Sequence, residues 1–158
     1  MFTNIPLEML VPIVTTLLKL IPTIIQKNNN SKGTSKLLLI EVNRNLKNIL
    51  NAIKMKIDFD AMIDILDNKE INKAIKNNYN FNKIKHWTIK SKHIKDVRNK
   101  RLIGKDCKWL FNNINMKIQE LKDLKEMNKS VLNLQNTNIT LKITNLLFKY
   151  KLLIYFIK

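Results

Sequence analysis

Residues 1–26 read MFTNIPLEMLVPIVTTLLKLIPTIIQ, and this apolar stretch decides how the whole chain is interpreted. It carries two charges, Glu8 and Lys19, whereas the remainder of the chain is rich in lysine. Its apolar residues recur at steps of three and four, which predicts a helix with one broad apolar face and a thin polar stripe. That face comprises Leu7, Leu10, Val11, Val14, Leu17, Leu18, Ile21, Ile24 and Ile25. Such a face has to be buried against something.

Three environments would bury it. The helix could lie in a lipid interface or self-associate, it could span a bilayer, or it could be a core helix of a soluble bundle. As a span, Met9 to Ile25 is short and contains Lys19, Pro12 and Pro22. No basic n-region or small-residue cleavage site marks a signal peptide. We expect a protruding helix whose membrane or oligomer interface is formed by Leu10, Val14, Leu17, Leu18, Ile21, Ile24 and Ile25.

The composition predicts an all-α fold. The chain has 158 residues with two glycines and three prolines, and a β or α/β domain of this size would need more turn residues. The stretch KNNNSKGTS separates the first helix from the rest. We therefore expect an amphipathic helix over residues 1–27, a polar hinge over 28–35 and a helical bundle over 36–158.

Periodicity and capping residues predict the helices of this bundle. Their expected limits are Lys36–Lys56 with Ser35 as N-cap, Phe59–Leu66 with Asp58 as cap, a short helix after an Asp67–Glu70 capping box, Lys92–Ile103 between Ser91 and Gly104, a helix from Asp106 to Met127, and Thr137–Ile157. The last of these is apolar over a wide arc, so we expect it at the centre of the bundle or against another chain.

The formal net charge is +17, and nearly all of the cations are lysines. The segment Lys83–Lys108 holds ten Lys and Arg against two acids, together with both histidines and Trp87. Lysines there can hold phosphates as point charges, and a tryptophan can stack on a base. The residues predicted to bind a polyanion are Lys92, Lys95, Arg98, Arg101, Lys105 and Trp87. The alternative is a solvated face in a lysine-biased protein, because only three residues are arginine.

No catalytic residue, metal site, cofactor or small-molecule substrate is predicted. Phosphate-binding loops and nucleophile elbows need glycines that this chain lacks. Two histidines and one cysteine do not form a zinc site. Cys107 is expected to be a core residue, since nothing in the spacing couples it to His86 or His93. A single cysteine fits a reducing compartment, so we expect a cytoplasmic protein, with membrane association through the first helix as an option.

A resemblance to known proteins rests on three stretches of sequence. These are LLLIEVNRNLKNILNAI (Leu37–Ile53), WLFNNINMKIQELK (Trp109–Lys122) and ITLKITNLLFKYKLLIYFIK (Ile139–Lys158). Together with the hydrophobic first helix, they resemble small helical accessory or effector proteins of bacterial antiviral defence (abortive-infection) loci. The resemblance implies a membrane-linked or complex-bound effector and not a metabolic enzyme.

The sequence therefore predicts a non-enzymatic assembly or effector module that oligomerises, joins a protein complex or meets an anionic membrane through its first helix. The alternative is a nucleic-acid-binding accessory subunit, without sequence specificity, that acts through residues 83–108.

Overall fold

The computed structural model describes residues 5–28, 33–135 and 137–158, and within them it contains helices and no strand. The α-helices are α1 (Val11–Lys27), α2 (Thr34–Lys54), α3 (Phe59–Asp64), α4 (Lys69–Lys76), α5 (Cys107–Asn128) and α6 (Ile139–Ile157). The 3-10 helices are η1 (Leu7–Leu10), η2 (Phe81–Lys83), η3 (Ser91–His93), η4 (Val97–Leu102) and η5 (Val131–Asn133). The predicted all-α class is confirmed.

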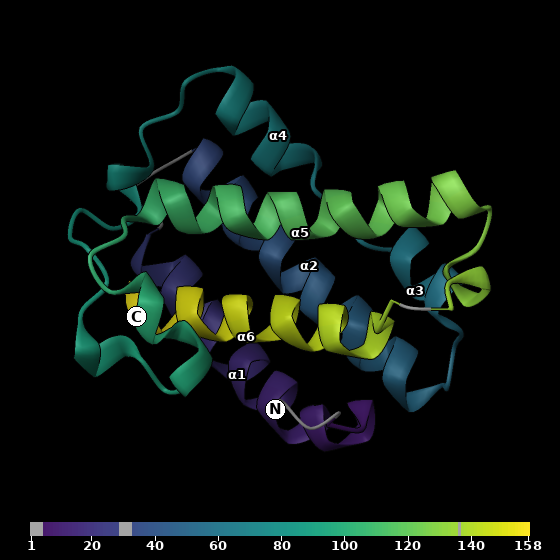
Figure 1. Cartoon of the computed structure of the whole chain (residues 1–158). Coiled ribbons are helices and arrows are strands. Elements are labelled where there is room, and N and C mark those ends of the chain that lie inside the picture. Colours follow the sequence, from purple (N-terminus) through teal and green to yellow (C-terminus); the bar gives the residue numbers. More distant parts are fainter. Residues whose placement is uncertain (1–4, 29–32, 136) are drawn as a thin grey trace.

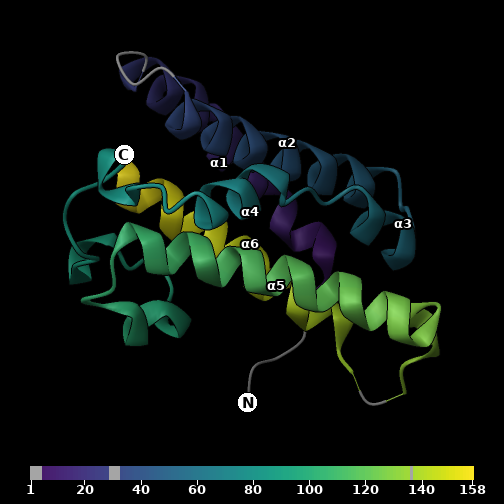
Figure 2. The same cartoon turned by 90° about the horizontal axis from the view of Figure 1, so that it is seen from above.

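Two antiparallel helix pairs form the bundle. α1 and α2 form one pair, and α5 and α6 form the other (Figure 1). α6 also contacts α1, so it joins the two pairs, while the short helices α3 and α4 contact both α2 and α5. The segment between α4 and α5, teal in the figures, lies at the end of the bundle where α6 finishes (Figure 2). This arrangement brings η3 and η4 against α6.

The apolar N-terminal helix is present and only partly buried. Its inward stripe of Val14, Leu17, Ile21 and Ile24 is buried, and Leu10 of η1 continues it. α1 packs on α2 and α6 of the same chain, so this part of the helix does not stand apart from the bundle as a protruding element would. The physical reason is that α6 and α2 present apolar faces of their own, which the α1 stripe completes. Of the predicted hinge, residues 29–32 lie outside the described residues.

The C-terminal helix is central, as its wide apolar arc predicts. Thirteen of its residues are buried, and α6 contacts α1, α5 and the 3-10 helices η1, η3 and η4. Leu146, Tyr150 and Leu153 are completely inaccessible. Much of the core therefore belongs to this one helix.

Local capping signals predicted several boundaries correctly. The Asp58 carboxylate accepts the Ala61 N–H at 2.8 Å and starts α3, and the Asp106 carboxylate accepts the Trp109 N–H at 2.8 Å and starts α5. The predicted N-cap of α2 is wrong by two positions, because Gly33 occupies it and Ser35 lies inside the helix. Ser35 is buried and its hydroxyl is hydrogen-bonded to the Tyr79 hydroxyl, which ties α2 to the chain after α4.

The predicted continuous helix over Lys92–Ile103 is also wrong. The chain forms η3 and then η4, and Asp96 interrupts them by accepting the Arg98 N–H at 2.9 Å as the N-cap of η4. Few apolar residues in this stretch could have buried one helix face. Two backbone hydrogen bonds instead hold the ends of the segment together, from Ile89 N to Lys105 O and from Gly104 N to Ile89 O. Gly104 has φ +87°, the left-handed conformation expected for it.

The start of α4 differs from the predicted capping box. Asn68, not Asp67, is the N-cap, and the main acceptor comes from another helix. The Glu41 carboxylate of α2 accepts the N–H of Glu70 at 2.5 Å and the N–H of Ile71 at 3.1 Å. Glu41 is fully buried. A carboxyl group on α2 therefore satisfies two first-turn donors of α4.

Glu41 gives the stability of the bundle a pH dependence. Burial raises the pKa of this carboxyl from 4.5 to about 7, against the lowering effect of its two backbone hydrogen bonds. The folded chain therefore holds the Glu41 proton between pH 4.5 and 7, where the unfolded chain has released it. Raising the pH through this window removes stability. We expect the free energy of unfolding of the wild type, measured relative to Glu41→Gln, to fall from pH 5 to pH 8; parallel curves for the two proteins would contradict this assignment.

Candidate anion-binding site

A pocket of about 400 Å³ lies between η4, α5 and α6 and is surrounded by cationic side chains. We call it the cationic pocket. Its walls are formed by Val97, Arg98, Lys100 and Arg101 of η4, Lys117 of α5, and Leu141, Asn145 and Lys149 of α6. Five of these eight described residues are Lys or Arg, and none of them is acidic. Such a wall favours an anion.

Lys149 is the most unusual member of the cationic pocket. It is a lysine that is only 4% exposed, and most of the neighbouring buried residues of α6 are apolar. Its ammonium donates to Asn99 Oδ1 at 2.5 Å, and Asn99 Nδ2 donates in turn to the Phe148 carbonyl at 3.1 Å. Asn99 is 2% exposed. A buried amide therefore fixes the direction of the Lys149 ammonium.

The charges around Lys149 are mostly positive. Burial is the main cause that lowers the pKa of Lys149 from 10.5 to about 8, and the cations Lys117, Arg101 and Arg98 lower it further, while Asp96 acts in the opposite direction. Burial also lowers the pKa of Lys117. The cationic pocket thus carries positive charge that the side chains in its wall do not neutralise.

Two carboxylates lie near the cationic pocket, and each has a cationic partner. Asp96 caps η4 and lies 3.7 Å from Arg98 Nε. Glu120 of α5 forms an ion pair with Lys142 of α6 and also acts on Lys117, whose pKa it raises against the lowering effect of burial. The Arg98 guanidinium is held over the Phe148 ring at 4.4 Å. Arg98 is thus the pocket cation that has an acidic partner, while neither carboxylate forms part of the pocket wall.

The structure divides the six predicted polyanion-binding residues. Arg98 and Arg101 meet in the cationic pocket. Lys92 and Lys95 are exposed around η3, where Lys95 lies 5.9 Å from the Tyr155 ring. Trp87 and Lys105 lie near the two ends of the segment that the Ile89 hydrogen bonds close. Trp87 is 65% exposed with the Lys90 ammonium 5.8 Å from its ring, and the Lys105 ammonium lies 5.6 Å from the Trp109 ring.

Lys117 and Lys149 are the residues that sequence reasoning missed. Both lie on helices outside the basic segment, and Lys117 has apolar neighbours at Ile114 and Ile118 in sequence. A signal for Lys149 exists in the sequence. It stands within LLFKYKLLIYF, where a lysine on a helix that is apolar on nearly all sides has to be buried or paired.

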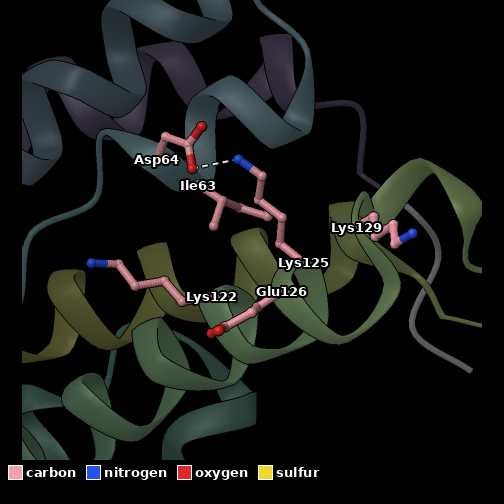
Figure 3. Close-up of a pocket in the computed structure, with 6 residues that line it drawn as sticks. All are labelled: Ile63, Asp64, Lys122, Lys125, Glu126 and Lys129. Carbon is pink, nitrogen blue, oxygen red and sulfur yellow. Dashed lines mark hydrogen bonds and ion pairs between the residues drawn. The ribbon is translucent and has the colours of Figure 1, made fainter.

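A second pocket of about 370 Å³ lies between α3 and α5 (Figure 3). It is lined by Ile63, Asp64, Lys122, Lys125, Glu126 and Lys129. Its charges compensate one another, because Lys125 pairs with Asp64 and also donates to the Asp60 carbonyl at 3.3 Å. Lys122 and Lys129 extend to opposite sides of this pair (Figure 3). Two carboxylates in its wall make this pocket a poorer anion site than the cationic pocket.

The predicted membrane or oligomer interface is largely internal. Leu10, Val14, Leu17, Ile21 and Ile24 are buried within the chain, while Leu18 and Ile25 are partly exposed. The segment Leu7–Lys27, with a mean hydropathy of 1.7, is long and apolar enough to cross a membrane. The core helix of a soluble protein can have the same length and hydropathy. An interface through the five buried residues would need α1 to leave the bundle. Association through α1 stays a prediction.

The residues considered for catalysis or metal binding have structural surroundings. Cys107 is buried at the start of α5, and burial raises the pKa of its thiol to about 12. His93 Nδ1 accepts the Lys90 N–H at 2.9 Å, and its ring packs edge-on against Phe156. In the described part of the chain, no three His, Cys, Asp or Glu side chains are grouped as metal ligands would be.

Comparison with protein-family models, with curated proteins and with solved structures found no match to this chain. The resemblance to proteins of antiviral defence loci therefore stays a prediction.

Proposed function

We propose that this protein is a non-enzymatic accessory subunit that binds single-stranded nucleic acid through its basic segment and the cationic pocket. The observation that carries the proposal is the convergence of five cationic side chains, from three elements of the chain, on one pocket without an acidic residue in its wall. Such a wall would attract the phosphate groups of a nucleic acid, which is a polymer with one negative charge on each nucleotide.

The surroundings of the cationic pocket support a polymer as the ligand. Lys92, Lys95 and Lys100 are exposed on the same segment and would continue a positive path along its surface. The exposed Trp87 ring is available for a base to stack on, and base–aromatic stacking contributes without reading sequence. Lysine supplies most of the charge, so the binding is expected to be weakly selective and sensitive to salt.

Fluorescence anisotropy with a labelled single-stranded oligonucleotide tests this function. The variant carries Gln in place of Lys92, Lys95, Arg98 and Arg101. Each lost phosphate contact lowers the slope of log affinity against log salt by about 0.7, so four contacts would lower it by about 3. We expect the variant to bind more weakly at about 50 mM salt and to show a flatter salt dependence up to about 200 mM.

A matched control separates this site from the effect of net charge. The variant Lys47, Lys54, Lys73 and Lys76→Gln removes the same charge from exposed positions on α2 and α4. It is expected to keep most of the affinity and the slope. Equal losses in the two variants, or binding that persists at high salt with a sequence preference, would contradict the proposed function.

A further inference from the structure

Lys149 has a partner set that is incomplete for a buried cation. Its ammonium meets the neutral Asn99 Oδ1 and faces the cations Lys117 of α5 and Arg98 and Arg101 of η4. Buried charges are normally paired with an opposite charge, because leaving water without such a partner is costly. The acid that acts on Lys149, Asp96, is occupied by Arg98 and by the η4 backbone. An anion in the pocket would supply the opposite charge that the wall of the pocket lacks.

The shape of the cationic pocket indicates the size of that anion. At about 400 Å³, it has room for a tetrahedral phosphate together with part of the group that carries it. Arg101 can present a planar set of donors, while the Lys149 and Lys117 ammoniums act as point charges from the two opposing helices. Leu141 and Val97 provide apolar wall beside these donors.

We propose that the cationic pocket is a binding site for a single dianionic phosphate group, held by Lys149, Lys117 and Arg101, with Asn99 as the residue that positions Lys149. This inference rests on the proposed function for its location, but it assigns one defined phosphate where the function needs only a charged surface. The phosphate could belong to a nucleic-acid terminus or to a free phosphate, since both offer the same dianion.

The lowered pKa of Lys149 gives this site a characteristic pH response. A bound dianion would raise this pKa from about 8 and cause the site to take up a proton. A phosphate monoester loses its second proton near pH 6, so its charge no longer changes above pH 8. Burial also lowers the pKa of Lys117, while Glu120 acts in the opposite direction. Affinity for the dianion is therefore expected to fall as the pH rises above 8.

Isothermal titration of the full chain with inorganic phosphate tests the site. Lys149→Met removes the charge and retains an unbranched side chain, while Asn99→Asp keeps Lys149 and places a competing carboxylate beside it. We expect each to weaken phosphate binding by at least about tenfold, as for the loss of a charge-assisted hydrogen bond. Lys122→Met, in the pocket between α3 and α5, is the control and should bind as the wild type does. Circular dichroism establishes that each variant is folded.

Two oligonucleotides that differ in one group, a 5′-phosphate or a 5′-hydroxyl, distinguish the two sources of the phosphate, a nucleic-acid terminus and a free phosphate. Tighter binding of the 5′-phosphorylated strand that disappears in Lys149→Met would assign the site to a nucleic-acid terminus. Equal binding of the two strands, with inorganic phosphate still dependent on Lys149, would assign it to a free phosphate or a small ester.

The outcomes also separate this inference from the proposed function. Phosphate binding that is absent, or that is unchanged in both Lys149→Met and Asn99→Asp, overturns the phosphate site even where the oligonucleotide still binds with the expected salt slope. The reverse result, phosphate binding that depends on Lys149 without oligonucleotide binding, retains the site and removes the function.

Discussion

Leu17→Asp is expected to unfold much of the bundle, whereas Thr16→Asp should leave it nearly intact. Leu17 is 1% exposed on the stripe of α1 that packs on the core, and Thr16 is exposed on the polar stripe. The substitution removes the packing of a buried leucine and places a carboxyl group in apolar surroundings. We expect a loss of at least about 4 kcal/mol in the free energy of unfolding, measured by urea titration. A small domain has about 5–15 kcal/mol in total.

Sedimentation equilibrium on the same two variants distinguishes the structure from the prediction of a free apolar helix. If the Leu17 face acted between molecules or on a membrane, Leu17→Asp would change the association state and leave the unfolding transition unchanged. That result would mean that α1 undocks from α2 and α6 in solution. Loss of stability specific to Leu17 would instead assign this face to the core.

Leu153→Ala is expected to lower the free energy of unfolding by about 2–5 kcal/mol, the range for a fully buried leucine whose cavity cannot collapse. Leu153 is 0% exposed on α6, and this helix contacts α5 of its own pair and α1 of the other pair. Because α6 is packed between α1 and α5, the cavity left by the substitution has little room to collapse, which favours a large loss of stability. Thermal and urea unfolding monitored by circular dichroism give the measurement.

The same change at an exposed position provides the control. Leu132 of η5 is 64% exposed, so Leu132→Ala should stay within about 0.5 kcal/mol of the wild type. Similar effects at the two leucines would show that α6 is peripheral in solution and would contradict the central position of this helix.

Features that depend on neighbouring residues were predictable from the sequence. The Asp58 and Asp106 carboxylates accept hydrogen bonds from N–H groups three residues away, so both partners of each bond lie within a short stretch of sequence. The wide apolar arc of residues 139–157 likewise identified the central helix. Periodicity correctly described the apolar face of α1, but it could not say whether lipid, a second copy or the same chain covers that face.

Features that depend on distant residues were not predictable in the same way. The Lys92–Ile103 stretch has helical propensity, but tertiary hydrogen bonds such as Asn99 to the Phe148 carbonyl favour 3-10 turns. The cationic pocket combines Arg101, Lys117 and Lys149, which lie on three separate elements. Arg98 and Arg101 share one basic segment of the sequence, whereas Lys117 and Lys149 reach them only through the packing of α5 and α6.

The cap that Glu41 gives to α4 has a consequence for the order in which the chain folds. α4 has eight residues, and isolated helices below about 12–15 residues are marginal in water. Its first-turn donors are bonded by a residue 29 and 30 positions earlier in the chain. α4 therefore gains its helical state together with the docking of α2, as one cooperative unit. An intermediate with α4 formed and α2 detached would lack the cap and the packing on α2, and would keep only the contacts of α4 with α5.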